Sequence, residues 1–295
     1  MTKPCPFCRG TGSSAKRNSA GLLLCHACKS AYWETSWDAR EVLSHYEPYY
    51  SSGPVSYDLL TGCRYRAILN RFEEWKSPGR LLDVGCGAGH FLTEAEARGW
   101  QASGLEVSRS GLDILKRVKE EGRFKFSIIE GHLEDARFPA ESFDAITLFE
   151  VIEHLEEPSV LLREVHRLLT KKGILYLTTP NYGSLSRIIL GNRWRVVAEE
   201  HRCLATTKAI RFLLKELGFQ PIALATKNID LSEIMKKMRP QPSNRKNDEN
   251  QRVSSSQRLR HRIENVPFLR WSKTAANYFL RMFHRGDTLE VFALK

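Results

Sequence analysis

Two pairs of cysteines near the start of the chain have a spacing that suits one metal ion. Cys5 and Cys8 form one C-x-x-C pair, Cys25 and Cys28 form the other, and sixteen residues separate the two pairs. Two such pairs can supply the four tetrahedral thiolates that structural zinc prefers. Because this set leaves no open position, the sequence predicts a structural zinc in a small, zinc-ribbon-like knuckle over residues 1–35. Four reduced cysteines without a metal are the alternative.

A glycine-rich turn after an apolar strand is the second chemical signal. The segment Leu81–Gly89 reads LLDVGCGAG, with Asp83 placed directly before the turn. Glycines let the backbone approach a ligand closely, and open α/β sheets bind ligands at the carboxyl ends of their strands. A carboxylate at Asp83 suits the amino acid part of a zwitterionic cofactor and would repel the pyrophosphate of a dinucleotide. Glu106, at the end of the next strand, can bond both hydroxyls of a ribose, as dinucleotide sites also do.

Two acids and a histidine follow the fourth expected strand. Glu150, Glu153 and His154 stand at i, i+3 and i+4, so a helical turn would place all three on one face. Two carboxylates and an imidazole suit Mg²⁺, Mn²⁺ or Zn²⁺. Two alternatives remain open: His154 as a metal-free general base, and acids that only stabilise a helix N-terminus.

These groups can act together only if the fold brings them to one place. From residue 80 to residue 220, short apolar runs alternate with amphipathic helical patterns, which predicts a parallel sheet with helices on both faces. The expected strands are Arg80–Val84, Ala102–Glu106, Lys125–Glu130, Phe143–Leu148, Gly173–Thr178, Phe219–Lys227 and Thr288–Leu294. The expected helices are Tyr65–Trp75, His90–Arg98, Ser110–Glu120, Pro158–Leu169, Thr207–Leu217 and an amphipathic one over Phe268–Phe283.

The ordered motifs between Arg80 and Phe219 resemble those of class I S-adenosylmethionine (SAM)-dependent methyltransferases. Besides the LLDVGCGAG turn they include GHLED from Gly131, FPAESFDAITL from Phe138, EVIEHL from Glu150 and LLTKKGILYLTTPN up to Asn181. The resemblance is to the branch that includes the ubiquinone-biosynthesis O-methyltransferases and many bacterial cell-surface glycan methyltransferases. It implies a Rossmann-like sheet of seven strands, in which the final strand is antiparallel and lies near the edge.

The resemblance also implies which residues contact SAM. They are Asp83, Gly85 and Gly87 at the methionine part, Glu106 at the ribose, Leu133 and Glu134 beside the adenine, and Phe149 next to the sulfonium. The E-x-x-E-H pattern is similar to the metal motif of small-RNA 2′-O-methyltransferases and of the ubiquinone-pathway enzymes. In the RNA family a downstream histidine completes the site, and His201 stands in the comparable place.

Composition divides the chain into five segments. They are a zinc knuckle (1–35), a helical and aromatic lid segment (36–78), a SAM-binding core (79–220), a basic insertion with an amphipathic helix (221–285) and a final edge strand (286–295). The lid segment carries Tyr46, Tyr49, Tyr50 and Tyr57, which either cover an acceptor or anchor the knuckle. From Pro221 to Arg285 there are fourteen lysines and arginines against five acids. Such a segment suits an anionic membrane or RNA, or is a helix that only covers the sheet.

The leading functional hypothesis is SAM-dependent O-methylation of a small, glycan or lipid-linked acceptor, with possible help from a divalent ion such as Mg²⁺. The alternatives are an RNA methyltransferase of the 2′-O type and a non-catalytic zinc-binding adaptor that retains the fold. No run of 18 apolar residues and no signal-peptide pattern is found, and seven cysteines suit metal or free thiols. A cytoplasmic location is therefore the expectation.

Overall fold

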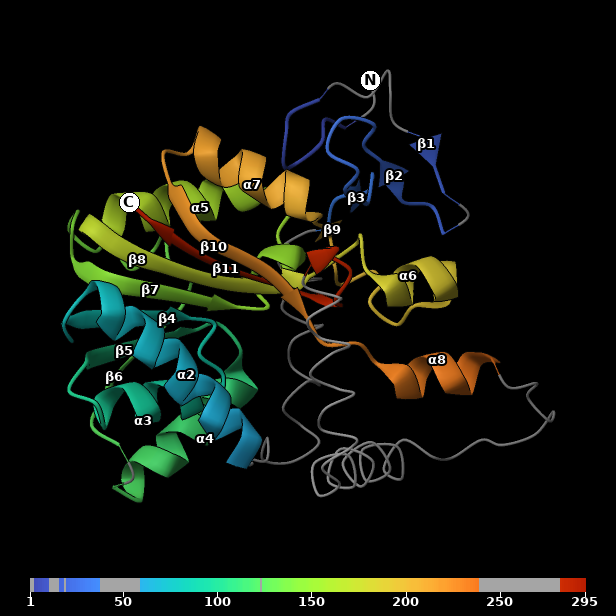
Figure 1. Ribbon diagram of the computed structural model, residues 1–295. Coiled ribbons are helices and arrows are strands. Elements are labelled where there is room, and N and C mark those ends of the chain that lie inside the picture. Colours follow the sequence, from blue (N-terminus) through green and yellow to red (C-terminus); the bar gives the residue numbers. More distant parts are fainter. Residues whose placement is uncertain (1–2, 11–15, 19, 38–58, 123, 239–281) are drawn as a thin grey trace.

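The computed structural model describes residues 3–10, 16–18, 20–37, 59–122, 124–238 and 282–295. Within them, a seven-stranded sheet has the order β10-β11-β8-β7-β4-β5-β6 (Figure 1). Its strands are β4 (Arg80–Val84), β5 (Gln101–Glu106), β6 (Ser127–Glu130), β7 (Phe143–Phe149), β8 (Leu169–Pro180), β10 (Gln220–Lys227) and β11 (Thr288–Leu294). The pairs from β8 to β6 are parallel, which confirms the predicted fold class.

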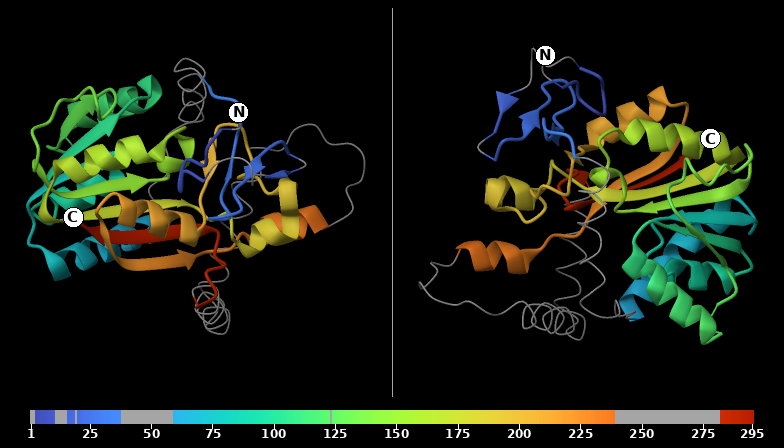
Figure 2. Two further views of the ribbon diagram at one scale, coloured as in Figure 1. Left: turned by 90° about the horizontal axis from the view of Figure 1, so that it is seen from above. Right: turned by 180° about the vertical axis from the view of Figure 1, so that it is seen from behind.

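Helices cover both faces of this sheet, as predicted (Figure 2). One face packs against α2 (Leu59–Trp75), α3 (His90–Glu96) and α4 (Arg109–Glu120), and the other against α5 (Pro158–Leu168) and α7 (Thr207–Glu216). The helices begin at ordinary sequence signals: the Ser108 hydroxyl accepts the N–H of Gly111 ahead of α4, and Pro158 is the first residue of α5.

The final strand is antiparallel and lies near the edge of the sheet, as the resemblance implies, but it is not the edge strand itself. β11 pairs with β8 on one side and with β10 on the other, so β10 is the edge strand. Lys227 at the end of β10 lies opposite Thr288 at the start of β11. The connection from β10 to β11 therefore starts and ends at the same end of the sheet. Its length in the sequence does not determine which of the two strands lies at the edge.

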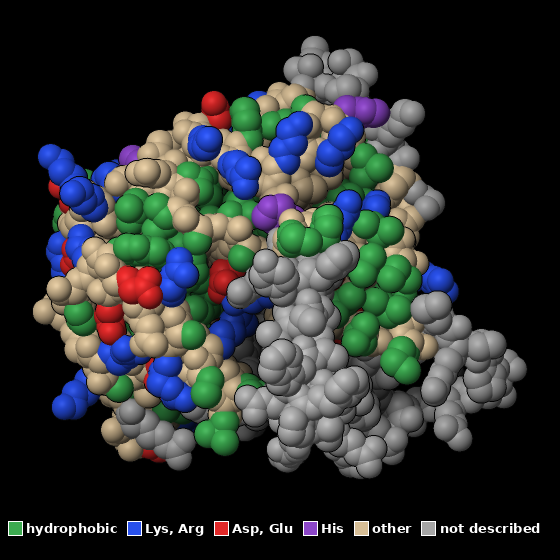
Figure 3. All heavy atoms as spheres, in the orientation of Figure 1, with side chains coloured by type: hydrophobic (Ala, Val, Ile, Leu, Met, Phe, Trp, Pro, Cys, Tyr) green, Lys and Arg blue, Asp and Glu red, His purple; other side chains and the backbone are tan. Residues whose placement is uncertain are grey.

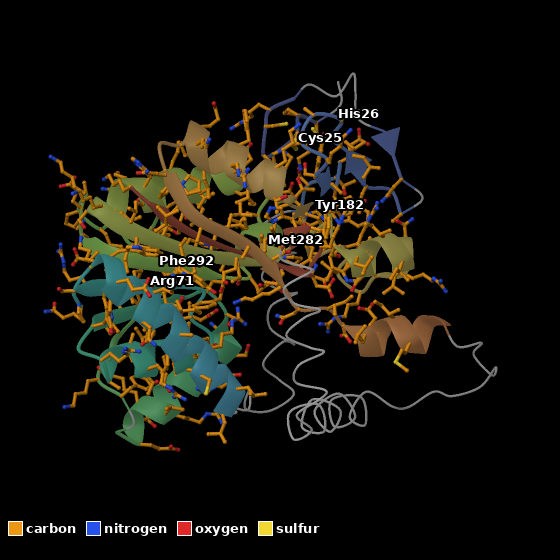
Figure 4. All side chains as sticks on the ribbon, in the orientation of Figure 1. Cys25, His26, Arg71, Tyr182, Met282 and Phe292 are labelled. Carbon is orange, nitrogen blue, oxygen red and sulfur yellow. The ribbon has the colours of Figure 1, made fainter. Side chains whose placement is uncertain are left out.

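The aromatic residues of α2 fix this helix on the sheet. Phe72 is fully buried and its ring makes edge contacts with Phe91, Trp100, Tyr176 and Phe292. Arg71 of α2 lies next to Phe292 of β11, with its guanidinium 5.3 Å from the ring centroid (Figure 4). The predicted helix of the lid segment thus joins the core through Ile68, Leu69 and Phe72.

A second sheet joins the N-terminal segment to the core. It has the order β1-β2-β3-β9, with β1 (Lys16–Arg17), β2 (Leu23–Leu24), β3 (Ala31–Tyr32) and β9 (Cys203–Leu204). Three strands come from the expected knuckle, and the fourth comes from the segment that precedes α7. The knuckle is therefore continuous with the core through backbone pairing.

Several predicted features lie outside the described residues. They are the tyrosines Tyr46, Tyr49, Tyr50 and Tyr57 and nearly all of the amphipathic segment Phe268–Phe283. Among the described elements, α6 (Leu185–Leu190) and α8 (Leu231–Met238) expose the large apolar side chains Ile188, Ile189, Leu231 and Met235, and hydrophobic side chains gather on this part of the surface (Figure 3). None of the helices in the described ranges has the length and apolar character needed to cross a membrane.

Removing the ring of Phe72 should destabilise the core strongly. Phe72→Ala deletes a fully buried ring from an aromatic cluster, so the free energy of unfolding should fall by about 3–5 kcal/mol. Phe212→Ala is the matched control because its ring on α7 is 44% exposed, and its cost should stay near 0.5 kcal/mol. Urea unfolding monitored by circular dichroism measures both, and equal costs would contradict this account of the α2 interface.

Candidate functional site

The glycine-rich turn lies at the carboxyl end of β4, where the sequence places it. Gly85 and Gly87 both have positive φ angles, of 72° and 54°, which side-chain-bearing residues rarely adopt. The N–H groups of Gly85 and Cys86 donate to the carbonyl of Leu105 on β5, at 2.8 and 3.1 Å. The turn is thus bent back across the end of the neighbouring strand.

Glu106 ends β5 and its carboxylate lies inside this turn. It is 4% exposed, and its Oε2 accepts the N–H of Gly87 at 2.8 Å. Its Oε1 accepts the hydroxyl of Ser108 at 2.8 Å and the N–H groups of Ser108 and Val107 at 2.9 and 3.1 Å. With one oxygen held by three donors, the carboxylate has a fixed orientation, and Oε2 keeps acceptor capacity for a diol.

Asp83 is the second buried acid at this edge, and it lies beside Glu106. It is 2% exposed, and its Oδ1 accepts the hydroxyl of Thr147, its register partner on β7, at 2.5 Å. Burial, together with the charge of Glu106, raises the pKa of Asp83 to about 7 despite this hydrogen bond. A carboxyl group held this way becomes a strong acceptor as soon as a cation such as an ammonium group approaches.

The other predicted cofactor contacts differ in exposure. Leu133 is 1% exposed and belongs to the core, whereas Glu134 beside it points to solvent. Phe149 ends β7 and makes edge contacts with Tyr65 and Phe91, which form an aromatic wall at the end of the strand.

Arg64 belongs to this wall, and the sequence reasoning missed it. Its guanidinium carbon lies 6.0 Å from the centroid of the Phe149 ring, and its buried Nε has no hydrogen-bond partner. A signal was present, because Arg64, Ile68 and Phe72 stand at i, i+4 and i+8 and place a cation on the apolar stripe of α2.

Glu153, His154 and His201 come together beyond the end of β7. One ligand atom from each lies within 4.8 Å of the others, and the imidazole centroids are 4.9 Å apart. His154 Nδ1 bonds the carbonyl of Glu200 at 3.0 Å, and His201 Nδ1 bonds the carbonyl of Val196 at 2.8 Å. Both carbonyls fix the proton on Nδ1, so each Nε2 keeps a lone pair for a metal or a proton.

The carboxyl group of Glu153 fits a cation at this cluster. It is 1% exposed, Oε2 accepts the hydroxyl of Thr179 at 3.0 Å, and the buried Oε1 has no partner. Burial and the nearby charge of Glu150 raise the pKa of Glu153 well above its usual range. An orphaned carboxylate oxygen beside two imidazole lone pairs is the donor set of a borderline divalent ion.

Glu150 does not stand on a helical face with Glu153 and His154 as predicted, although its side chain still interacts with that of Glu153. The turn at this point is a short 3₁₀ helix, Ile152–His154, and Glu150 lies before it with a φ of 54°. Its N–H donates to the carbonyl of Thr178, and its side chain is exposed. Glu150 instead lines a cavity of about 110 Å³ together with Trp194 and Asp287.

The four predicted zinc ligands also come together. The Sγ atoms of Cys5 and Cys28 are 3.5 Å apart, as are those of Cys8 and Cys25, and all four lie within 4.8 Å. A tetrahedral zinc with bonds of about 2.3 Å needs sulfurs roughly 3.8 Å apart, which this set provides. His26 is exposed next to Cys25 and does not join the cluster (Figure 4).

The two C-x-x-C turns are built alike, and their thiols are coupled. Arg9 and Lys29, each just after the second cysteine of a pair, have φ angles of 55° and 63°. The hydrogen bond between Cys5 and Cys28 lowers the pKa of Cys5 to about 5 and raises that of Cys28. One thiol can therefore ionise only at the expense of its neighbour, until a cation balances both charges.

Comparison with known proteins relates this arrangement to one group. The sequence matches the family described as "Methyltransferase domain" over residues 57–224. It is 32% identical over 108 residues to the ubiquinone biosynthesis O-methyltransferase of Actinobacillus pleuropneumoniae, a match that covers 35% of this chain and 46% of that protein. The chain thus spans about half the length of the curated relatives it matches.

Solved structures share the fold at low identity. A SAM-dependent methyltransferase from Archaeoglobus fulgidus superposes with a TM-score of 0.54 and 17% identity, covering 88% of this chain and all of that one. Phosphoethanolamine N-methyltransferase 2 from Haemonchus contortus, in complex with SAM, superposes with a TM-score of 0.57 and 19% identity, covering 90% of this chain and 61% of that one.

The raised pKa of Asp83 predicts a specific pH dependence of stability. An acid with a higher pKa in the folded state binds its proton more tightly there, so its contribution is greatest near pH 4 and is lost as the pH rises to about 7. Asp83→Asn should abolish this loss. Urea unfolding between pH 4 and pH 8 should therefore show the Asn variant gaining on the wild type up to about pH 7. A constant difference would contradict the burial argument.

Proposed function

The chain belongs to the methyltransferase domain family, and from this premise we propose that it transfers a methyl group from SAM to a hydroxyl group of a small acceptor. The observation that carries the proposal is the pair of buried carboxyl groups, Asp83 and Glu106, at the carboxyl ends of β4 and β5 beside the glycine turn. An ammonium group and a ribose diol are the ligands that two such acceptors would take. SAM carries both, and when bound it supplies an electrophilic methyl carbon on a sulfonium.

Each residue at this edge has a role in holding the cofactor. Asp83 would accept from the amino group of the methionine part, and Arg64 would pair with its carboxylate. Glu106 would accept from the ribose hydroxyls through Oε2, since Oε1 is already satisfied. The turn at Gly85 and Gly87 leaves room for the backbone to approach. Leu133 and Glu134 would border the adenine, and Phe149 would face the sulfonium.

We further propose that Glu153, His154 and His201 hold a divalent ion beside the acceptor. Both histidines have Nδ1 committed to a carbonyl, which orients Nε2 as a ligand. Mg²⁺, Mn²⁺ or Zn²⁺ bound there would lower the pKa of an acceptor hydroxyl. We assign Glu150 to the acceptor side of the site, because it lines the cavity that Trp194 and Asp287 also line. Without a metal, the same Nε2 of His154 would take the acceptor proton directly.

A small acceptor is favoured over the other candidates. Relatives that match part of the sequence bear the name of an O-methyltransferase of ubiquinone biosynthesis, and a glycan or lipid-linked hydroxyl needs the same chemistry. RNA methylation draws on the similar E-x-x-E-H motif and the basic segment 221–285. Peripheral contact with an anionic membrane draws on that same segment. The intact glycine turn and both buried acids argue against a non-catalytic adaptor.

The cysteine cluster is proposed to bind structural zinc. Its four sulfurs lie within 4.8 Å of one another, so one tetrahedral ion could bind all four, and a cation would balance the charge of their thiolates. A site closed by four thiolates has no position for a substrate, so the zinc would hold the N-terminal segment together rather than react.

Blocking the glycine turn should abolish cofactor binding. A side chain at Gly85 would start 3.1 Å from Val151 and add a long charged group at the proposed cofactor turn, so Gly85→Arg should lose SAM affinity by isothermal titration. Gly191→Arg is the matched control, because Gly191 has a similar φ of 57° but open space around it. SAM should bind this control normally. Wild-type affinity in Gly85→Arg would remove the basis of the proposed activity.

Neutralising Glu153 should weaken a bound ion and turnover without weakening SAM binding. Glu153→Gln keeps the shape but removes the charge from the cluster, so Mn²⁺ affinity should fall by roughly 10–100-fold. Glu216→Gln at the exposed end of α7 is the control and should bind Mn²⁺ normally. Electron paramagnetic resonance of free Mn²⁺ measures the affinity, and methylation of a catechol probe with labelled SAM measures turnover. Full activity after exhaustive chelation would instead favour His154 as the base, and its alanine variant would then be inactive.

A further inference from the structure

The segment between Val196 and Thr206 is shared by the candidate site and the cysteine knuckle. His201 belongs to the candidate metal cluster, and two residues later the chain enters β9, which pairs with β3 of the knuckle. The N–H of Trp33 donates to the carbonyl of Arg202 at 3.1 Å, and Trp33 Nε1 donates to the carbonyl of Ala198 at 3.2 Å. The knuckle thus contacts this segment on both sides of His201.

Arg202, directly after His201, joins three parts of the chain through one buried guanidinium. The residue is 2% exposed, and its Nε donates to Oε1 of Glu156 at 2.7 Å. Nη1 donates to the carbonyl of Glu199 at 2.9 Å, and Nη2 donates to the carbonyl of Thr35 in the knuckle. The ring of Trp37 lies against the guanidinium, with 4.7 Å from Cζ to the centroid. A planar fork is needed to serve these partners at once.

Glu156 completes this junction from the opposite side. Its Oε1 accepts from Nε of Arg202 at 2.7 Å and from the backbone N–H of Trp37 at 3.2 Å. Its Oε2 pairs with Lys3. Glu156 lies two residues after His154, so the Arg202–Glu156 pair links the two stretches of chain that supply the ligands of the cluster.

A second contact ties the same two stretches together. The Sγ of Cys203 lies 3.4 Å from the carbonyl oxygens of Ile152 and Leu155, which bracket Glu153 and His154. Farther along, the hydroxyl of Thr206 donates to the carbonyl of Cys28 at 2.6 Å. The positions of Glu153, His154 and His201 thus depend on contacts that run through β9 to the cysteine turns.

We propose that Arg202 is a positioning residue for the Glu153–His154–His201 cluster, and that the knuckle acts as the support on which this cluster is assembled. This inference rests on the metal site of the proposed function. Arg202 does not touch the ion or the substrate. It holds the loop of His154, the turn of His201 and the knuckle at fixed separations, so that one ligand atom from each of Glu153, His154 and His201 lies within 4.8 Å of the others.

The experiment compares Arg202→Met and Arg202→Lys with the wild type in three measurements. Mn²⁺ affinity, from electron paramagnetic resonance, reports the cluster, because Mn²⁺ prefers carboxylate and imidazole to thiolates. Zinc content by elemental analysis reports the knuckle, and SAM affinity by calorimetry reports the core. Arg211→Met, on the exposed face of α7, is the matched control.

Mn²⁺ affinity should fall about 10-fold or more in both Arg202 variants, as for other outer partners of metal ligands, while zinc content and SAM affinity stay close to wild type. Lysine should not rescue the affinity, because one ammonium cannot reach Glu156 and two carbonyls together. A purely structural role would lower only the unfolding midpoint and leave Mn²⁺ affinity unchanged in the folded protein.

Equal Mn²⁺ affinity in the wild type and both variants would overturn the positioning role. So would a joint loss of Mn²⁺, zinc and SAM binding in Arg202→Lys, because that pattern is general unfolding. A wild type that binds SAM but no Mn²⁺ would remove the metal cluster and this inference together, and methyl transfer would still stand. A wild type that binds Mn²⁺ but no SAM would contradict the proposed function alone.

Discussion

Parallel strands end at one edge of a sheet, and this geometric constraint governs the whole site. β4, β5, β7 and β8 run in the same direction, so the residues just beyond their carboxyl ends converge although they are distant in sequence. Asp83 and Glu106 become neighbours because β4 pairs with β5, and Asp83 meets Thr147 because β4 also pairs with β7. The residues of the candidate site come together at this edge only because the strands have that order.

Buried carboxyl groups show where this edge is prepared for a ligand. Glu106 is oriented by four donors, Asp83 by one, and Glu153 by one with its second oxygen unpartnered. Removing such groups from water is costly unless hydrogen bonds compensate for the lost hydration. The buried Oε1 of Glu153, which has no partner, therefore distinguishes this residue from Glu156, whose two oxygens are paired and hold neighbouring segments together.

The sequence predicted the parts of the molecule that depend on local patterns. Strand β4 has the bounds expected from its apolar run, and the cysteine spacing brought four thiols together. The helical face expected for Glu150 failed because a 3₁₀ turn of three residues begins only at Ile152. Periodicity describes a regular helix and contains no information about a left-handed residue that interrupts it. The edge position expected for β11 failed for a similar reason, since strand order in a sheet is a long-range property.

The connection between knuckle and core was the hardest feature to predict from the sequence, because none of its parts has a distinctive sequence pattern. Cys203 and Leu204 are too short a run to predict a strand, and Arg202 looks like any surface cation beside two glutamates. Their structural role depends on β3. The outer backbone groups of β3 need hydrogen-bond partners, and β9 supplies them next to His201. A small cysteine-bound sheet with little core of its own gains stability by pairing with the larger domain. The larger domain in turn gains a rigid support for the loop around His201, which lies outside its helices and long strands. The knuckle and the candidate metal cluster are thus mechanically one structure, although 172 residues lie between Cys28 and His201 in the sequence.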